Sequence, residues 1–343
     1  MDLVKTVFVL LVTFAGAIYL VVSGLALSLC KDYVVLPNDT QLSIVHALVP
    51  IYAYATAYCV IAGELTKNVS QVDRLWSIIP AVYAGYAAYF LNFASERANL
   101  MMICVVVWSV RLTYNFSRRG GYSSWLPWEG DEDYRWELLR GMTPFKGNPI
   151  AWSLFNIFFI CVYQMGLLLL ITLPVIFSAS SPISLTDFVL AGVFLALVLY
   201  EATADNQQYA FQTEKYRRIN SNEVLGEYYG AGFITTGLWA FSRHPNYFAE
   251  QSIWIVFYGF SVSATGAWFN PTGLGAVLLV LLFQGSAQFS EEITAKKYPL
   301  YKKYQDRTSC FVPFPWLQPM SLENCGTAAP GTRRSPRLRK KKD

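Results

Sequence analysis

Charged residues and histidines are scarce in this chain of 343 residues. Asp, Glu, Lys and Arg together make up 15% of it, whereas soluble domains carry about 25%. Only two histidines, His46 and His244, are present. Membrane desaturases and hydroxylases hold a di-iron centre with many histidines, so that class of enzyme is excluded.

Several catalytic and nucleotide-binding motifs are also missing. The chain has no G-x-S-x-G elbow of serine hydrolases, no P-loop and no G-x-G-x-x-G dinucleotide fingerprint. Its six cysteines are scattered and form no C-x-x-C pair, so we expect neither a disulfide framework nor a metal site. A nucleotide that binds here does not use a Rossmann domain.

Apolar residues, in contrast, are abundant. They make up 54% of the chain, and the mean hydropathy is +0.32. Apolar runs of about 20 residues recur from end to end, which is the length that crosses a bilayer as a helix. The sequence therefore predicts an all-α, polytopic membrane bundle of about eight transmembrane helices. We expect these helices near residues 6–29, 42–62, 75–93, 98–116, 150–177, 184–204, 247–265 and 273–289.

The distribution of basic residues predicts the orientation. The loops near 178–186 and 265–272 contain no Lys or Arg, whereas segments 117–149 and 205–245 contain many. The positive-inside rule makes the basic segments cytosolic. Both termini are then expected in the cytosol, and the loop 30–41 with its glycosylation sequon in the lumen.

The last eleven residues, 333–343, form a basic tail with seven basic residues and one acidic residue. Such a tail suits anionic lipid headgroups. It ends Lys-Lys-Lys-Asp, which matches the dilysine retrieval signal of endoplasmic reticulum membrane proteins. We therefore expect an integral protein of the endoplasmic reticulum membrane, with no nucleic-acid partner.

The segment Ser242–Glu250 places several polar side chains where a loop enters an apolar span. Ionisable groups at membrane depth are costly unless they are paired or line a cavity. Pro245 suits the first turn of a helix, and Asn246 and Glu250 then share one helical face. The segment predicts a functional site, and the alternative is a helix cap with an interfacial anchor.

A polar stripe is predicted in the helix near 196–212. Glu201, Asp205, Gln208 and Gln212 are spaced by four, three and four residues, so they lie on one face. A solvated helix end explains Gln212. Glu201 follows a wholly apolar stretch, which favours a cavity or a partner for its carboxylate.

Five other residues carry candidate roles. Arg111 lies about one turn below the end of its span, where it either snorkels to the surface or holds a phosphate or carboxylate. Asp73 is expected either to cap a helix or to act as a general acid, and Tyr114 is the second candidate proton donor. Glu291 and Glu292 close the last span, where two acids oppose the helix dipole. A basic neighbour such as Arg243 or a cofactor amide is expected to compensate them.

Five pieces of the sequence resemble the DUF1295 membrane proteins of the steroid 5α-reductase-like clan. They are Gln71-Val72-Asp73-Arg74-Leu75-Trp76-Ser77, Arg111-Leu112-Thr113, Glu132-Asp133-Tyr134-Arg135-Trp136, Glu201-x3-Asp205-x-Gln207 and Gly237-Leu238-Trp239-x2-Ser242-Arg243-His244-Pro245-Asn246-Tyr247-Phe248-x-Glu250. The resemblance runs from about 65 to 316. It divides the chain into N-terminal helices (1–64), a membrane domain (65–316) and a basic tail (317–343).

This resemblance implies a helical membrane enzyme that holds NADPH and reduces a conjugated double bond in a lipid such as a sterol or enone. In that clan an Asn and a Glu four apart contact the cofactor, and here these are Asn246 and Glu250. Where the clan has a basic residue in the polar stripe, this chain has Gln212. Trp108 replaces the tyrosine that steroid reductases place three residues before Arg111, so that tyrosine's role as a proton donor does not carry over.

The C-terminal part also resembles isoprenylcysteine and phospholipid methyltransferases, which share Arg-His-Pro-x-Tyr, a later pair of glutamates and a Tyr-x-x-Tyr-like segment. That resemblance implies S-adenosylmethionine as an alternative cofactor. A non-catalytic, lipid-binding protein is the third alternative.

The leading hypothesis is an NADPH-dependent reductase of a lipid or sterol-like substrate, embedded among membrane lipids. Asp73 and Tyr114 are the candidate proton donors. The candidate cofactor-binding residues are Arg111, Glu201, Asp205, Arg217, Arg218, Arg243, His244, Asn246, Tyr247, Glu250, Glu291 and Glu292.

Overall fold

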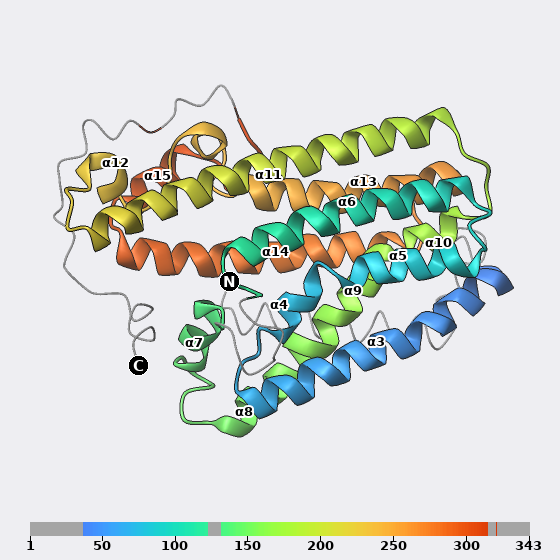
Figure 1. The fold of residues 1–343 in the computed structure, drawn as a ribbon, viewed down its shortest axis with the longest axis horizontal. Coiled ribbons are helices and arrows are strands. Elements are labelled where there is room, and N and C mark those ends of the chain that lie inside the picture. The colour runs from blue at the N-terminus through green and yellow to red at the C-terminus, as the bar shows by residue number, and fades with distance from the viewer. Residues whose placement is uncertain (1–36, 123–131, 315–319, 321–343) are drawn as a thin grey trace. The chain divides into compact units, whose positions relative to one another are not determined.

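The computed structural model describes residues 37–122, 132–314 and 320 (Figure 1). The predicted first span, the dilysine signal and the basic tail lie outside these residues. Within them the chain forms helices joined by turns and loops. In chain order these are α3 (Asp39–Thr66), α4 (Gln71–Trp76), α5 (Ile79–Phe90), α6 (Glu96–Arg118), α7 (Tyr134–Arg140), α8 (Pro149–Phe155), the π-helix η1 (Asn156–Tyr163), α9 (Gln164–Thr172), α10 (Pro174–Ser178), α11 (Leu185–Asn220), α12 (Gly226–Gly230), the 3-10 helix η2 (Gly237–Ala240), α13 (Pro245–Thr265), α14 (Gly273–Lys297) and α15 (Tyr301–Arg307).

The predicted all-α membrane bundle is confirmed. Among the described residues, five helical segments are long and apolar enough to cross a membrane: Asp39–Thr66, Glu96–Arg118, Pro149–Ser178, Leu185–Asn220 and Gly273–Lys297. Each coincides with a predicted span. The total of eight stays a prediction.

Two of the predicted spans within the described residues are not among these five. The run 75–93 is interrupted after α4, and α5 covers only 12 residues, about 18 Å at 1.5 Å per residue. The run 247–265 does form one helix, α13, which begins at Pro245 as its fixed φ predicts.

The N-cap position of α4 is Ser70, not Asp73, so the expected capping role of Asp73 is wrong.

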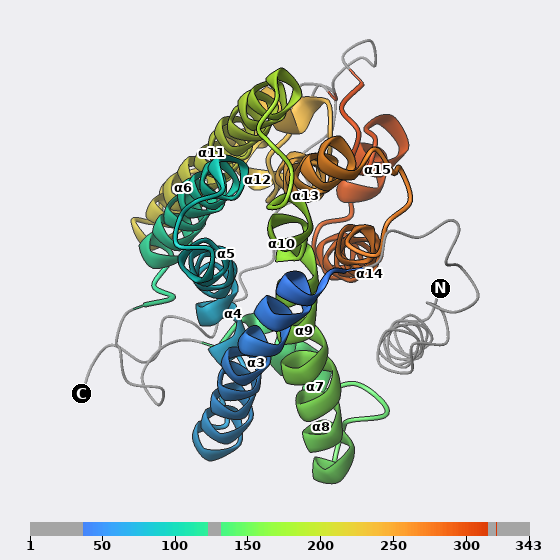
Figure 2. The same ribbon diagram turned by 90° about the vertical axis from the view of Figure 1, so that its right-hand side faces the viewer.

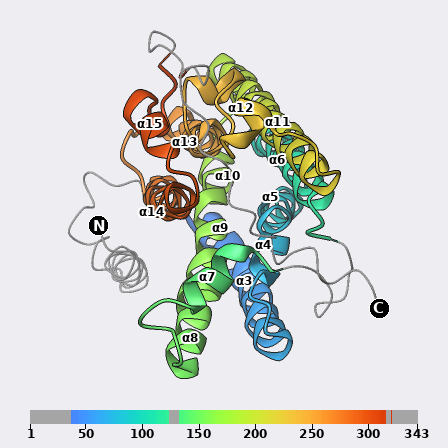
Figure 3. The ribbon, with the colours of Figure 1, turned by 90° about the vertical axis from the view of Figure 1, so that its left-hand side faces the viewer.

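Two compact units make up the fold. The first unit comprises the described residues up to Ala202 together with Asn246–Ser290, and the second comprises Thr203–Pro245 and the described residues from Glu291 onward. In the first unit α5 packs along α6, and α3 packs against η1 and α9 (Figure 2). The second unit contains α12 and α15 (Figure 3). There Phe233 packs edge-on against Tyr301 of α15.

Local sequence signals explain several helix ends. Asn38, the asparagine of the predicted sequon, starts α3 by a capping box: its side chain accepts from the Gln41 amide, and the Gln41 side chain accepts from the Asn38 amide. Pro149 and Pro174 occupy first turns, where a missing amide costs nothing. Asn38 and Pro149 mark the beginnings of two candidate spans, whereas Pro174 lies within the candidate span Pro149–Ser178.

Candidate functional site

A buried ion pair joins two helices of the first unit. The guanidinium of Arg111, on α6, contacts the carboxylate of Glu201, on α11, and both side chains are almost fully buried. Glu250, on α13, lies 4.0 Å from the same guanidinium nitrogen. Three candidate residues that are far apart in the sequence therefore converge. Arg111 pairs with a carboxylate of the protein itself, and its role in holding a ligand stays a prediction.

Two tryptophans hold the Glu250 carboxylate. The indole N–H of Trp108 donates to Oε2 at 2.8 Å, and that of Trp254 donates to Oε1 at 3.0 Å. The two rings meet edge to face, with centroids 5.0 Å apart. Each oxygen of this buried carboxylate therefore has a hydrogen-bond donor. Trp108, which cannot serve as a proton donor to a substrate, here positions an acid.

The charges of this cluster do not cancel. Glu201 and Glu250 carry two formal negative charges, and Arg111 carries one positive charge. Buried charge is costly unless it is compensated. Among these three side chains the acidic groups outnumber the basic one.

The other first-unit candidates lie in separate surroundings. Asp73 accepts a hydrogen bond from the Trp136 indole at 3.4 Å. Burial, reinforced by the nearby carboxylate of Asp133, raises the pKa of Asp73 to about 6. Tyr114 is 65% exposed, with the Arg118 guanidinium over its ring.

Asn246 and Tyr247 belong to the first turn of α13 and are half-buried. The Tyr247 ring packs edge-on against Phe283, with centroids 4.7 Å apart. Asn246 precedes Glu250 by one helical turn, as the spacing predicts.

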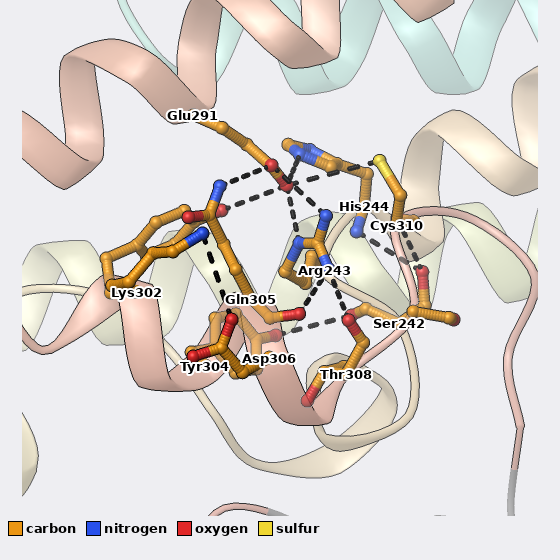
Figure 4. Close-up of polar contacts among 12 residues, drawn as sticks. Ser242, Arg243, His244, Glu291, Lys302, Tyr304, Gln305, Asp306, Thr308 and Cys310 are labelled. Atoms are coloured by element: carbon orange, nitrogen blue, oxygen red, sulfur yellow. Dashed lines mark hydrogen bonds and ion pairs between the residues drawn. The ribbon is translucent and has the colours of Figure 1, made fainter.

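A second polar cluster belongs to the second unit and is centred on Arg243 (Figure 4). Arg243 forms a bidentate interaction with the Glu291 carboxylate: Nε donates to Oε1 at 2.6 Å and Nη2 donates to Oε2 at 3.1 Å. Its Nη1 also donates to the main-chain carbonyls of Gln305 and Thr308. The expectation that a basic neighbour compensates Glu291 is confirmed. Glu292, the next residue, is exposed.

Other side chains complete the environment of Glu291. His244 Nε2 lies 3.0 Å from Oε1, and the Gln305 side chain donates to Oε2 at 2.8 Å. The Tyr301 hydroxyl donates to Oε1 at 3.4 Å. Main-chain hydrogen bonds join this segment to the loop after α15: the amides of Arg243 and His244 donate to the carbonyls of Ser309 and Cys310, respectively.

Three potential metal ligands gather in this cluster. His244, Glu291 and Cys310 offer ligand atoms within 4.8 Å of one another. However, both Glu291 oxygens already accept from the permanently charged Arg243. Burial raises the pKa of the Cys310 thiol to about 11, so it is protonated at neutral pH. This donor set fits an ion-pair network better than a metal centre.

The remaining candidates in the second unit differ in exposure. Asp205 is buried. Arg217 is half exposed and pairs with Glu214 and Glu223, and Arg218 pairs with Glu214. To bind a phosphate, both guanidinium groups would have to leave their carboxylate partners. Their role in phosphate binding stays a prediction.

Sequence reasoning missed several participants. Trp254 lies four residues after Glu250, so helical spacing alone places its indole beside that carboxylate. No spacing in the sequence indicates that Gln305, Thr308 and Cys310 lie near Arg243. They reach the Arg243 cluster through α15 and the loop that follows it.

One family model and a curated protein match most of this chain. The model of the family described as "Protein of unknown function (DUF1295)" matches residues 59–308. "Uncharacterized protein C594.04c" of Schizosaccharomyces pombe is 35% identical over 262 residues, which cover 72% of this chain and 73% of that protein. No solved structure matches. The matched segment contains both the Arg111–Glu201–Glu250 cluster and the Arg243–Glu291 cluster, and the chain belongs to the DUF1295 family.

Proposed function

We propose that this membrane protein is an NADPH-dependent reductase of a carbon–carbon double bond in a lipid or sterol-like enone. The proposal joins the resemblance to steroid 5α-reductase-like proteins with the chemistry of the buried residues. It places the enzyme in the endoplasmic reticulum, with both termini in the cytosol, where NADPH is supplied.

The observation that carries the proposal is the convergence of Arg111, Glu201 and Glu250 among apolar helices. When bound, NADPH supplies a hydride. The carboxylates of Glu201 and Glu250 would accept hydrogen bonds from its carboxamide or ribose hydroxyls. Their negative charge would favour a cofactor that becomes more positive as it gives up the hydride.

The protein must also protonate the substrate. Asp73 is the better supported candidate, because a carboxyl with a pKa of about 6 still carries a proton in an appreciable fraction of molecules near neutral pH. The side chain of Tyr114, the other candidate, is largely exposed.

A second candidate is supported by the same surplus charge. The sulfonium of S-adenosylmethionine is a cation, and a buried cluster with one net negative charge favours it. A methyltransferase of the isoprenylcysteine or phospholipid type is therefore the rival function. A lipid-binding protein without catalysis is the third reading.

Ligand titration separates these candidates. The full-length protein in detergent is titrated with NADPH and with S-adenosylmethionine, and the melting temperature and NADPH fluorescence are followed. We expect NADPH alone to raise the melting temperature. Glu250→Gln should abolish the rise, because it removes one of the two acidic charges while keeping the shape of the side chain.

The matched control is Glu223→Gln, since Glu223 is an exposed glutamate paired with Arg217. It should leave the NADPH effect unchanged. A rise with S-adenosylmethionine alone would replace the reductase with the methyltransferase. A rise with neither cofactor would favour the non-catalytic reading.

A further inference from the structure

A cavity of about 450 Å³ opens in the first unit, and its lining includes none of the residues Arg111, Glu201 and Glu250. Its walls come from the last turn of α3, the end of α7 and the beginning of α8. The C-terminal end of α3 lies beside α8, where Ser153 contacts Glu64 (Figure 1). The residues that matter for its chemistry are Glu64, Lys67, Arg140, Trp152 and Ser153.

The cavity presents both signs of charge. The Glu64 carboxylate is fixed by Ser153, whose hydroxyl donates at 3.2 Å, and by Asn156, whose amide donates at 2.9 Å. Lys67 follows one turn later and is 81% exposed, with its ammonium 3.8 Å from Glu64. A carboxylate with about four acceptor sites keeps room for another donor.

The second cation is more constrained. The Arg140 guanidinium lies over the Trp152 ring, 4.6 Å from its centroid, and donates to Glu132 at 2.9 Å. It is about one third exposed. Arg140 and Lys67 therefore offer donors to a phosphate, while Glu64 offers acceptors to an amine.

The position of the cavity matches the headgroup layer of a bilayer. One candidate span ends at Thr66 and another begins at Pro149, so the cavity sits where two spans terminate. Large apolar side chains next to it in the sequence are exposed, among them Leu65 on α3 and Ile150 on α8. Exposed apolar residues at the end of a span contact acyl chains.

We infer that this cavity binds the headgroup of an aminophospholipid, with the phosphate between Lys67 and Arg140 and the primary ammonium at Glu64. The lining holds one acidic and two basic residues, and one of the two bases, Arg140, is already paired with Glu132 outside the lining. The side chains left to meet a ligand are of both signs, which suits a zwitterion better than a purely anionic headgroup. A primary ammonium donates hydrogen bonds to Glu64, and a trimethylated one cannot. The inference does not depend on the reductase proposal.

The test uses full-length protein in detergent and counts bound lipid by native mass spectrometry. Phosphatidylethanolamine, phosphatidylcholine and phosphatidic acid with the same acyl chains are titrated separately. We expect phosphatidylethanolamine to bind about tenfold more tightly than either of the others, the ratio that one charge-assisted hydrogen bond supplies. Equal binding of all three lipids would overturn the inference.

Variants assign the binding to the cavity. Glu64→Gln should remove the preference for phosphatidylethanolamine over phosphatidylcholine, and Lys67→Gln should weaken both about equally by loss of the phosphate contact. Lys67 is so exposed that its replacement leaves folding intact. The matched control is Lys146→Gln, which removes a neighbouring exposed cation that does not line the cavity. An equal loss with this control would show general charge attraction and overturn the inference.

Soluble phosphoethanolamine separates a lipid from a free headgroup. We expect it not to displace the lipid at millimolar concentration, because the acyl chains contribute part of the affinity. Full displacement at that concentration would show that the cavity takes a soluble phosphate compound, and the lipid assignment would fail.

Discussion

The guanidinium of Arg97 lies 2.7 Å from the carboxylate of Asp187, and both side chains are almost completely buried. Arg97 belongs to the first turn of α6, and Asp187 to the first turn of α11. Arg97 also donates to the main-chain carbonyl of Ser181, and Asp187 accepts from the amide and hydroxyl of Ser184. This pair fastens the starts of two candidate spans to the loop between α10 and α11.

Loss of Arg97 should therefore be costly. Arg97→Met leaves the Asp187 charge buried without its partner, which should destabilise the protein by about 3 to 5 kcal/mol. The melting temperature in detergent measures the loss. The double variant Arg97→Met/Asp187→Leu should recover much of it.

The control for this pair is Lys302→Met, which breaks the exposed Lys302–Asp306 pair. Its cost should stay within about 1 kcal/mol. Similar losses for Arg97→Met and Lys302→Met would contradict the role assigned to the buried pair.

Trp108 should stabilise the protein through its indole N–H. Trp108→Phe removes the hydrogen bond to Glu250 and leaves a buried carboxylate oxygen short of a donor, at a cost of about 1 to 3 kcal/mol. Thermal unfolding measures the change. Trp268→Phe is the matched control, because Trp268 is 76% exposed. If both variants melted alike, the indole would have no positioning role.

Arg243→Lys should test the second cluster. Lysine keeps the charge but cannot reproduce the fork to Glu291 together with the donation to the carbonyls of Gln305 and Thr308. We expect a loss of about 2 to 4 kcal/mol, measured by thermal unfolding without ligand. Arg217→Lys, at an exposed ion pair, should cost less than about 1 kcal/mol. An Arg243→Lys variant with wild-type stability and no NADPH binding would make Arg243 a ligand residue only.

Asp73 should make stability depend on pH. Its pKa of about 6 in the folded protein exceeds the value of about 3.9 in an unfolded chain. The favourable contribution is therefore complete below about pH 4 and is lost as the pH rises through 6. Asp73→Asn, which cannot ionise, should match the wild type at pH 4.

At pH 8 the same variant should be more stable than the wild type by up to about 3 kcal/mol. Melting temperatures of both proteins between pH 4 and 8 measure the difference. A constant difference over that range would show that the Asp73 carboxyl is not buried in the folded protein.

The sequence alone determined the class of fold and many local features. Long apolar runs had to become helices in a bilayer, because a lipid-exposed backbone must satisfy its own hydrogen bonds. Pro245 marked the start of α13 by its fixed φ. The spacing of Asn246, Glu250 and the missed Trp254 followed from the helical period. Even the pairing of Glu291 with a nearby arginine was predictable, since two acids at a helix C-terminus require compensation.

Only the tertiary structure decided which distant groups meet. The sequence does not indicate that Arg111 pairs with Glu201 or that Arg97 pairs with Asp187. Ion pairs between helices depend on the distance between those helices, whereas the helical period relates only residues of the same helix. From the sequence, Trp108 only replaces the tyrosine that steroid reductases use as a proton donor. The structure shows that its indole instead donates a hydrogen bond to Glu250. The residues of one segment determine which side chains share a face of its helix, whereas the packing of the helices determines which residues pair with a buried charge.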